Sequence, residues 1–444
     1  METGVRPVRI GILGLGTVGC GTVNVLARNA EEIARRAGRN IEVIQASVRD
    51  LQKARGCATS GIKLTQDAGE IVSNPQIDIV VELIGGYTPA RELVLQAIAA
   101  GKHVVTANKA LIAVHGNEIF KAAQERGVMV AFEAAVAGGI PIIKAIREGL
   151  AGNRVEWLVG IINGTGNYIL SEMSEGGRPF DAVLADAQRL GYAESDPTFD
   201  IEGIDAAHKL TILASIAFGI PLQFDKAYTE GITQVTPADI RYAAELGYRI
   251  KHLGIARHGN SSVELRVHPT LIPQRQLIAS VDGVMNAVLV KGDAIGPTLY
   301  YGAGAGAEPT ASAVVADLVD VVRTLTTDPH NRVPHLAFQP DALSDLKILP
   351  MEEVETSYYL RMQARDRPGV LAEIAQILAK HGISIEAVVQ KEPAEGEDVV
   401  PLIMLIHRVM EKHMNAALGQ IEELDGIEGK VTRLRMEHLH RDWK

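Results

Sequence analysis

The sequence predicts an α/β protein in three parts: a doubly wound parallel sheet, a mixed α+β middle part and a small C-terminal β-α-β-β-α-β unit. Three observations support this prediction. Short β-branched runs alternate with helical patterns through residues 8–132, as in successive βαβ units. Several prolines fall within a polar stretch at 326–354, which favours an extended linker. The 444 residues are enough for about three domains.

The predicted elements follow from local patterns along the chain. Apolar runs bounded by turn residues indicate strands, and longer amphipathic runs indicate helices. In residues 1–132 we expect strands at 8–13, 41–48, 79–84, 103–106 and 128–132, with helices at 17–37, 89–100 and 116–126. In residues 133–300 we expect a helix at 201–218 and strands at 262–267 and 284–290. In residues 355–436 we expect strands at 358–363, 384–390, 400–407 and 429–435, with helices at 368–380 and 410–423, which is a ferredoxin-like order.

Composition and charge exclude several classes of protein. The formal net charge is −10, so a non-specific binder of nucleic acid or of an anionic membrane surface is not expected. The longest apolar stretch, 210–222, is too short to span a membrane. Two cysteines, Cys20 and Cys57, cannot form a disulfide framework and are typical of a reduced, cytoplasmic protein.

A glycine-rich turn follows the first predicted strand and opens the first predicted helix. It reads Gly14-Leu-Gly16-Thr17-Val18-Gly19. In this strand–turn–helix context Gly14 allows a tight turn, Gly16 the close approach of a pyrophosphate, and Gly19 close packing of helix on strand. The phosphates would lie on free N–H groups at the helix N-terminus. The pattern predicts a Rossmann-type domain that binds a dinucleotide.

The end of the second predicted strand bears on which dinucleotide is bound. An acidic residue here favours the ribose hydroxyls of NAD, and an arginine favours the 2′-phosphate of NADP. The sequence offers both, Arg49 and Asp50. Lys53 and Arg55 nearby favour NADP, although a solvated basic loop would have the same composition.

Lysines and carboxylates indicate a second site. Lys109 follows a predicted strand at the ligand-binding edge of the sheet. Asp205 and Lys209 stand four residues apart and share one face of an apolar helix, after an acidic stretch that contains Glu194. A buried lysine needs a partner or a function. It could exchange a proton with a substrate oxygen, and the carboxylates could bind an ammonium group, although a surface ion pair is the plainer interpretation.

Six motifs in order, taken together, resemble homoserine dehydrogenase from about residue 8 to 436. They are the turn at 14–19, the Thr-Ala-Asn-Lys-Ala segment at 106–110, the glycine-rich turn at 133–141, the Asn-Gly-Thr-Gly-Asn-Tyr segment at 163–168, the acidic stretch and helix at 191–210, and the Gly-Ala-Gly-Ala-Glu-Pro-Thr segment at 304–310. The resemblance implies an NAD(P)-dependent enzyme that interconverts L-homoserine and L-aspartate 4-semialdehyde, on the route to threonine, methionine and isoleucine. It also implies a dimer or tetramer.

The resemblance assigns roles to individual residues. It makes Lys209 the catalytic acid/base and implies that the middle part, 133–300, binds substrate and joins subunits. It implies that the segment near 300–325 returns to the dinucleotide-binding domain. The remaining expected site residues are Gly191, Glu194, Asp205 and Lys109 for the substrate, and Gly306, Glu308 and again Lys109 for the coenzyme.

The turn at 133–141 is similar to the family's monovalent-cation site. By that likeness Glu133 would supply a side-chain oxygen, and Val136, Gly138 and Ile140 backbone oxygens. Oxygen donors suit a hard cation such as Na⁺. A plain tight turn is the alternative.

The C-terminal unit is similar to the ACT domain, a regulatory module that binds amino acids. Pro368 and Gly369 near a helix start fit a loop-to-helix ligand site. Within this family the expected effector is L-threonine. A purely structural or dimerising role is the alternative.

The two alternative functions are an aspartate-semialdehyde dehydrogenase and a non-enzymatic amino-acid sensor. Aspartate-semialdehyde dehydrogenase chemistry needs a cysteine nucleophile at the catalytic edge, and neither cysteine is expected there. A non-enzymatic amino-acid sensor could combine a nucleotide fold with an ACT domain, but it would not need Lys209 and its carboxylates.

Overall fold

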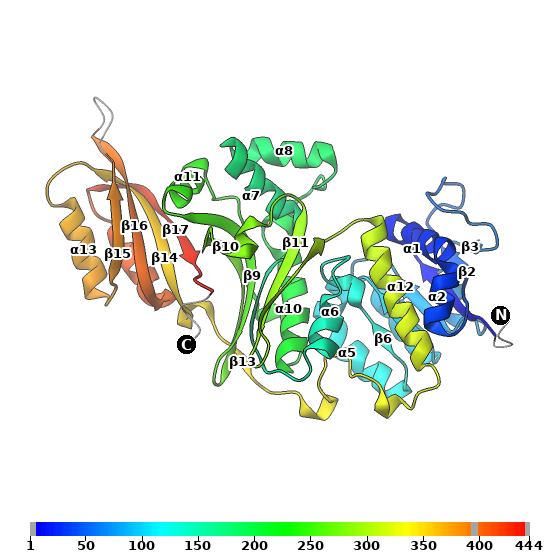
Figure 1. The fold of residues 1–444 in the computed structure, drawn as a ribbon. Coiled ribbons are helices and arrows are strands. Elements are labelled where there is room, and N and C mark those ends of the chain that lie inside the picture. The colour runs from blue at the N-terminus through cyan, green and yellow to red at the C-terminus, as the bar shows by residue number, and fades with distance from the viewer. Residues whose placement is uncertain (1–5, 392–397, 440–444) are drawn as a thin grey trace.

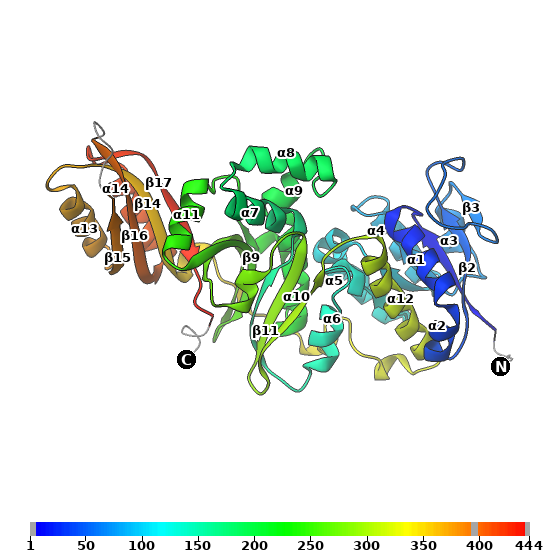
Figure 2. The same cartoon turned by 45° about the horizontal axis from the view of Figure 1, so that its top comes forward.

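The computed structural model describes residues 6–391 and 398–439 and shows three parts in a row. The parallel sheet and its helices lie at one end and the C-terminal unit at the other, with the mixed part between them (Figures 1 and 2). The predicted fold class is confirmed: a Rossmann-like parallel sheet, a mixed α+β part and an ACT-like unit.

The parallel sheet has six strands in the order β3-β2-β1-β4-β5-β6. Its order reverses between β1 and β4, which is where ligands bind in such sheets. Strand β3 was not predicted, because three residues are too few to show a pattern. The strands are β1 (Val8–Leu13), β2 (Ile41–Ser47), β3 (Lys63–Thr65), β4 (Ile79–Glu82), β5 (His103–Thr106) and β6 (Val130–Ala131).

The helices of this part correct two predictions. The helix expected over 17–37 is divided at Asn29, whose ψ of 21° departs from helical geometry. The helix expected from Gly116 begins seven residues earlier, because Asn108 caps it through a hydrogen bond from the Leu111 N–H. The helices are α1 (Thr17–Arg28), α2 (Ala30–Ala37), α3 (Gly69–Ser73), α4 (Ala90–Ala99) and α5 (Lys109–Arg126).

A segment distant in sequence completes the dinucleotide-binding part. Helix α12 (Ala307–Thr324) packs on α1, and Figure 1 shows the two side by side. The two backbones meet at Gly21, where an added Cβ would lie 2.5 Å from the carbonyl oxygen of Ala307. Glycine is therefore required for this close approach.

The middle part places helices against a long mixed sheet. The predicted helix over 201–218 is interrupted at Gly203, which has a φ of +82° and separates α9 from α10. The helices are α6 (Ile142–Lys144), α7 (Gly164–Gly176), α8 (Phe180–Leu190), α9 (Thr198–Ile201), α10 (Ile204–Phe218) and α11 (Pro237–Glu245). The strands are β7 (Val155–Ile161), β8 (Tyr228–Thr229), β9 (Tyr248–His258), β10 (Ser262–Pro273), β11 (Met285–Gly292) and β12 (Gly296–Ala303).

The C-terminal unit has the predicted β-α-β-β-α-β order and an antiparallel sheet, β17-β14-β16-β15. The linker is less extended than expected, since it contains short 3₁₀ turns and a strand, β13 (Lys347–Ile348), that pairs with β10. The remaining elements are β14 (Glu355–Arg365), α13 (Val370–Lys380), β15 (Ile385–Gln390), β16 (Val399–Met410), α14 (Glu411–Ile421) and β17 (Ile427–Met436).

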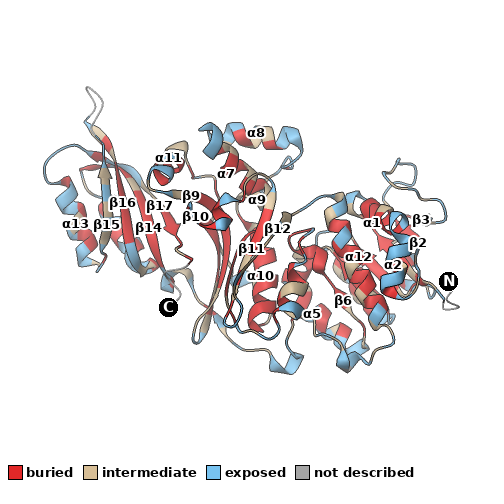
Figure 3. Cartoon of the chain, in the orientation of Figure 1, coloured by how far each residue is buried: buried red, intermediate tan, exposed pale blue. Residues whose placement is uncertain are grey.

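One sheet runs through the middle and C-terminal parts without a break. Strand β17 pairs in parallel with β10, with Thr270 opposite Arg435 and Leu271 opposite Met436. Buried residues continue across this joint (Figure 3), and the core cluster there combines Leu271 with Tyr359 and Leu434. Among the described residues, no helix has both the length and the apolar character needed to cross a bilayer.

The contact between α1 and α12 gives the first testable prediction. We expect Gly21→Ala to lower the midpoint of thermal unfolding, because its Cβ would force the two helices apart at a cost of about 1–3 kcal/mol. Gly419→Ala is the matched control, since Gly419 lies inside α14 with open space around it and alanine favours a helix. A Gly21→Ala midpoint equal to that of the unsubstituted protein would contradict the close-contact argument.

Candidate functional site

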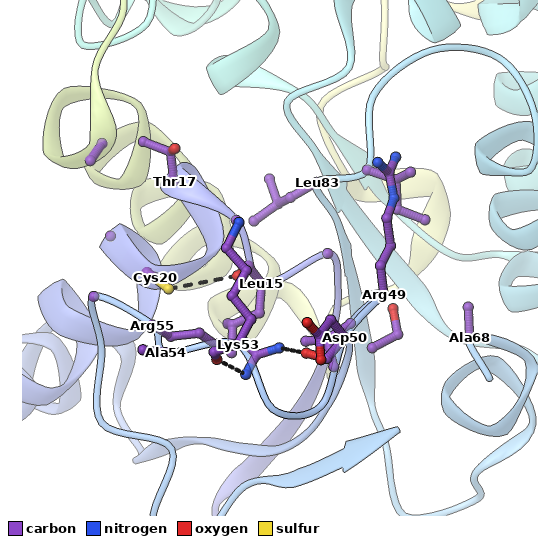
Figure 4. A pocket seen from close by; sticks show the side chains of 18 of the residues that line it. Leu15, Thr17, Cys20, Arg49, Asp50, Lys53, Ala54, Arg55, Ala68 and Leu83 are labelled. Atoms are coloured by element: carbon purple, nitrogen blue, oxygen red, sulfur yellow. Dashed lines mark hydrogen bonds between the residues drawn. The ribbon is translucent and has the colours of Figure 1, made fainter. Parts of the chain in front are cut away.

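A cavity of about 1000 Å³ opens at the carboxyl ends of the parallel strands. Gly14, Gly16 and Thr17 line it at the start of α1 (Figure 4). Gly14 has a φ of +95°, and a Cβ on it would lie 2.9 Å from the Leu83 carbonyl oxygen. A Cβ on Gly19 would lie 2.4 Å from the Gly14 carbonyl oxygen, so both glycines are needed for the turn to pack.

The start of α1 fits the diphosphate of a dinucleotide. No side chain caps this helix, so its first N–H groups are left for a ligand. A Cβ on Gly16 would meet no protein atom within 4 Å, which is the open approach that a phosphate needs. Val18 is partly buried and packs against the core cluster under the turn, and neither it nor Gly19 lines the cavity.

The loop after β2 closes the other end of the cavity. Asp50 accepts a hydrogen bond from the Gln52 N–H at 2.8 Å, and the Arg55 guanidinium donates to the Lys53 carbonyl at 2.7 Å and to the Asp50 carbonyl. The Arg49 guanidinium has no hydrogen bond or ion pair within the part of the chain described here. Figure 4 shows it pointing away from the Asp50–Arg55 loop. Among the described residues the Lys53 ammonium likewise has no hydrogen bond or ion pair, so Arg49 and Lys53 are both free to meet a phosphate.

The returning segment borders the same cavity. Ala307 and Glu308 line it, and Gly306, with a φ of +121°, precedes them at the start of α12. Glu308 receives two hydrogen bonds from Arg28 of α1, at 2.7 and 3.0 Å. These bonds, followed by the charge of Arg28, hold the Glu308 pKa below its usual value.

The two cysteines lie together at this cavity. Their sulfur atoms are 3.0 Å apart, and Cys20 lines the cavity wall. Burial, followed by the neighbouring thiol, raises the pKa of Cys57 to about 12. A protonated thiol is a poor nucleophile, so Cys57 does not suit thioester chemistry.

A second cluster forms where the dinucleotide-binding part meets the middle part. Asp205 in the first turn of α10 lies between two lysines, 3.0 Å from the Lys109 ammonium and 2.7 Å from the Lys209 ammonium. Lys109 is the first residue of α5, so the ion pair joins the two parts of the chain. Lys209 also donates to the Ile162 carbonyl at 2.7 Å.

Burial and charge act in opposite directions within this cluster. Burial alone would raise the Asp205 pKa, but Lys209 and Lys109 outweigh it and hold that pKa well below its usual value. Burial lowers the pKa of Lys209, and Asp205 opposes the shift only in part. Asp205 raises the pKa of Lys109, whose side chain is 42% exposed against 11% for Lys209. Lys209 is therefore the lysine that gives up a proton more easily.

The acidic stretch before α10 borders the cluster. Gly191 ends α8 with a φ of +77°, and Glu194 is exposed three residues later. Glu194 and Asp200 contribute to the raised pKa of Lys109, after Asp205. The charge of Glu194 therefore acts on the Lys109 ammonium.

Two polar residues of the site were not predicted. Asn163 donates from its amide nitrogen to Asp205 at 2.9 Å and to Asp200 at 2.7 Å. Its side-chain oxygen caps α7 by accepting from the Gly166 N–H, a signal that the sequence Asn-Gly-Thr-Gly carried. His208 is buried beside Phe224, with its Nε2 3.4 Å from the Tyr87 hydroxyl, and burial lowers its pKa to about 4. No local pattern marks such a histidine.

The turn that begins at Glu133 is buried at the start of the middle part. The Glu133 carboxylate accepts hydrogen bonds from the Ile143 and Lys144 N–H groups at 2.8 and 2.9 Å. Burial, which those bonds offset only in part, raises the Glu133 pKa. Gly138 has a φ of +48°, and a Cβ on it would lie 2.6 Å from the Gly304 carbonyl oxygen, so the turn requires glycine at this position.

The donors in this turn fit a hard cation. A carboxylate oxygen has two lone pairs, and each Glu133 oxygen uses only one of them in the bonds above. The Ile140 carbonyl already accepts from the Ile142 N–H and has one lone pair left. Val136 and Gly138 would add their backbone oxygens.

Comparison with known proteins identifies the family. Residues 14–133 match the family model described as "Homoserine dehydrogenase, NAD binding domain", 141–319 match "Homoserine dehydrogenase", and 358–426 match "ACT domain". A homoserine dehydrogenase of Pseudomonas aeruginosa is 68% identical over 98% of this chain and 100% of its own length.

Solved structures agree with these matches. The crystal structure of a homoserine dehydrogenase from Thiobacillus denitrificans superposes with a TM-score of 0.93, at 68% identity over 97% of this chain and 98% of that one. A hyperthermophilic archaeal homoserine dehydrogenase in complex with NADPH superposes with a TM-score of 0.62, at 27% identity over 72% of this chain and 98% of its own. The resemblance seen in the six motifs is confirmed: the chain belongs to the homoserine dehydrogenase family and is an oxidoreductase with a dinucleotide-binding domain and a C-terminal ACT domain.

Proposed function

We propose that this enzyme interconverts L-homoserine and L-aspartate 4-semialdehyde at the Lys109–Asp205–Lys209 cluster, with NADP(H) in the large cavity. The carboxylate of Asp205 held between two lysines is the observation that carries the proposal. It supplies charged groups for an amino-acid substrate and a buried lysine for proton transfer. A non-enzymatic sensor would require none of these groups.

Each side chain has a distinct task in this proposal. Asp205 and Glu194 bind the substrate ammonium, with Gly191 at the margin of the site and Lys109 beside the substrate carboxylate. Lys209 removes the proton of the C4 hydroxyl in the oxidation and returns it to the carbonyl oxygen in the reduction. The bound nicotinamide coenzyme supplies the hydride chemistry at C4. Burial prepares Lys209 for its task by lowering its pKa toward the working pH.

Lys209→Ala tests the catalytic assignment. We expect turnover to fall by at least about 100-fold, because the proton-transfer group is lost, while the affinity for NADPH measured by fluorescence titration stays the same. The control is Lys226→Ala, because Lys226 is exposed and bonds only to Gln223 among the described residues. Activity is followed as the absorbance of reduced coenzyme with L-homoserine. Turnover preserved in Lys209→Ala would remove Lys209 from the mechanism.

The balance between burial and charge predicts a pH dependence. A neutral Lys209 is the base for oxidation, so homoserine oxidation rises as pH rises through the Lys209 pKa, which burial holds below the usual lysine value. Asp205 raises the Lys209 pKa. In Asp205→Asn we therefore expect the increase in homoserine oxidation to occur at lower pH, and we also expect weaker substrate binding. The measurement is the pH profile of kcat. Asp196→Asn, at an exposed residue bonded to Thr198, is expected to leave the profile in place, and a profile unmoved in Asp205→Asn would contradict the coupling.

The free Arg49 guanidinium supports a preference for NADP. We propose that Arg49 binds the 2′-phosphate, whereas Asp50 is held by its own loop. Gly14, Gly16 and Thr17 then hold the diphosphate, with Val18 and Gly19 supporting the turn, and Gly306 and Glu308 close over the coenzyme from α12.

Arg49→Ala tests coenzyme choice. We expect the KM for NADP⁺ to rise about 10- to 100-fold, the loss of one charge-assisted pair, with the KM for NAD⁺ unchanged. Arg35→Ala on α2, a position outside the cavity lining, is the control. An equal rise for both coenzymes would mean that Arg49 does not read the 2′-phosphate.

Regulation, assembly and ion binding complete the proposal. A cavity of about 300 Å³ at the start of α13, lined by residues 364–371, Gln390 and Leu402, supports binding of an amino-acid effector, which we propose is L-threonine. Such feedback suits an enzyme of threonine, methionine and isoleucine biosynthesis in the cytoplasm.

We also propose that Glu133, Val136, Gly138 and Ile140 bind Na⁺. For the assembly we propose a homodimer or homotetramer.

A further inference from the structure

A buried arginine of the C-terminal unit reaches across the joint into the middle part. Arg435 lies on β17 with no solvent exposure. Its guanidinium donates to Glu411 of its own unit at 3.0 Å and to Glu230 of the middle part at 2.7 Å. It also donates to the Tyr228 hydroxyl at 3.1 Å. The charge of Arg435 is therefore shared between the two parts.

Glu230 is held at a single position by this arrangement. Its carboxylate accepts from the Tyr228 hydroxyl at 2.8 Å as well as from Arg435. Its backbone N–H donates to the Val267 carbonyl at 2.8 Å, and its own carbonyl accepts from His252 at 2.9 Å. Both the side chain and the backbone of Glu230 are thus anchored to the sheet.

The residues after Glu230 lie directly against the acidic stretch. The Ile232 N–H donates to the Ile201 carbonyl at 2.9 Å. A Cβ on Gly231 would lie 2.7 Å from that carbonyl oxygen and 2.5 Å from the Glu202 carboxylate, so the two segments touch through their backbones. Displacement of Glu230 must therefore displace residues 201–202.

The same stretch determines where the substrate-binding carboxylates lie. Asp200 is joined to Asp205 through the amide of Asn163, which donates to both. Gly203, which separates this stretch from α10, packs against His252, whose ring atom lies 3.1 Å from the site of its missing Cβ. A continuous series of hydrogen bonds and close contacts thus connects β17 with Asp205.

We propose that Arg435 and Glu230 are positioning residues for the substrate. Through this ion pair the C-terminal unit sets the placement of the acidic stretch, which contains Glu194 and which Asn163 joins to Asp205 at the start of α10. The inference rests on the proposed substrate site. The same ion pair also connects a bound effector with that site, because β17 pairs with β14, and the last residues of β14 line the smaller cavity. The pair acts on substrate affinity, and the coenzyme cavity lies outside its reach.

Glu230→Ala is the experiment. We expect the KM for L-homoserine to rise about tenfold, the loss of one charged hydrogen bond, with the KM for NADP⁺ unchanged within about twofold. Glu230→Gln keeps an oxygen that can accept from Arg435 and Tyr228, so it is expected to restore most of the affinity. The side chain is 30% exposed, so both variants are expected to fold.

The matched control is Arg361→Met. Arg361 of β14 also crosses the joint, to the buried Asp239 of α11 at 2.6 Å, but none of its bonds reaches residues 200–205. We expect a lower unfolding midpoint and an unchanged KM for L-homoserine. An equal rise in that KM in Arg361→Met, or a joint rise of both KM values in Glu230→Ala, would overturn the inference in favour of a general loosening of the joint. The Lys209→Ala test judges the substrate site independently.

Discussion

The carboxylate of Asp205 is the interaction on which the site depends. It is buried, and it can remain ionised there only because Lys109 and Lys209 lie within 3.0 Å of it. One lysine comes from the dinucleotide-binding part and the other from α10, so the same charge balance joins two parts of the chain. Removal of Asp205 would leave the buried Lys209 ammonium without its carboxylate partner.

The two lysines become chemically different because their surroundings differ. Lys209 lies deep in an apolar helix, and desolvation makes its charged form costly. Lys109 lies at a helix start with part of its side chain in solvent, and the neighbouring carboxylates stabilise its charge. A single fold thereby provides one lysine suited to proton exchange and one suited to binding an anion, with no change in residue type.

The joint between the middle and C-terminal parts follows a similar rule. Arg435 and Arg266 are both fully buried, and each is balanced by carboxylates from more than one segment. Parallel pairing of β17 with β10 makes the two sheets one, so the ACT domain is continuous with the sheet that supports the catalytic helices. Packed backbone rather than a flexible linker therefore connects the ACT domain with residues 201–202, which precede the helix that carries Asp205.

Local patterns in the sequence predicted much of the fold and part of the site. The glycine turn, the alternating strands and the Asp205–Lys209 pair are defined by spacings of a few residues, and the structure contains all of them. The break at Gly203, the short strand β3 and the cap at Asn108 were missed, since glycine, brief strands and capping depend on what surrounds them. The structure also showed that Val18 of the turn motif is partly buried and packs against the core.

The resemblance of six ordered motifs predicted the family, and spacings of a few residues predicted the dinucleotide-binding turn and the shared helix face of Asp205 and Lys209. Only the tertiary structure decided that Lys109 meets Asp205, that Asn163 bridges Asp205 and Asp200, and that Arg435 meets Glu230. These contacts join residues from 37 to 205 positions apart. Their pairing follows from how whole sheets and helices pack, and so does the burial that sets the pKa of each charged group.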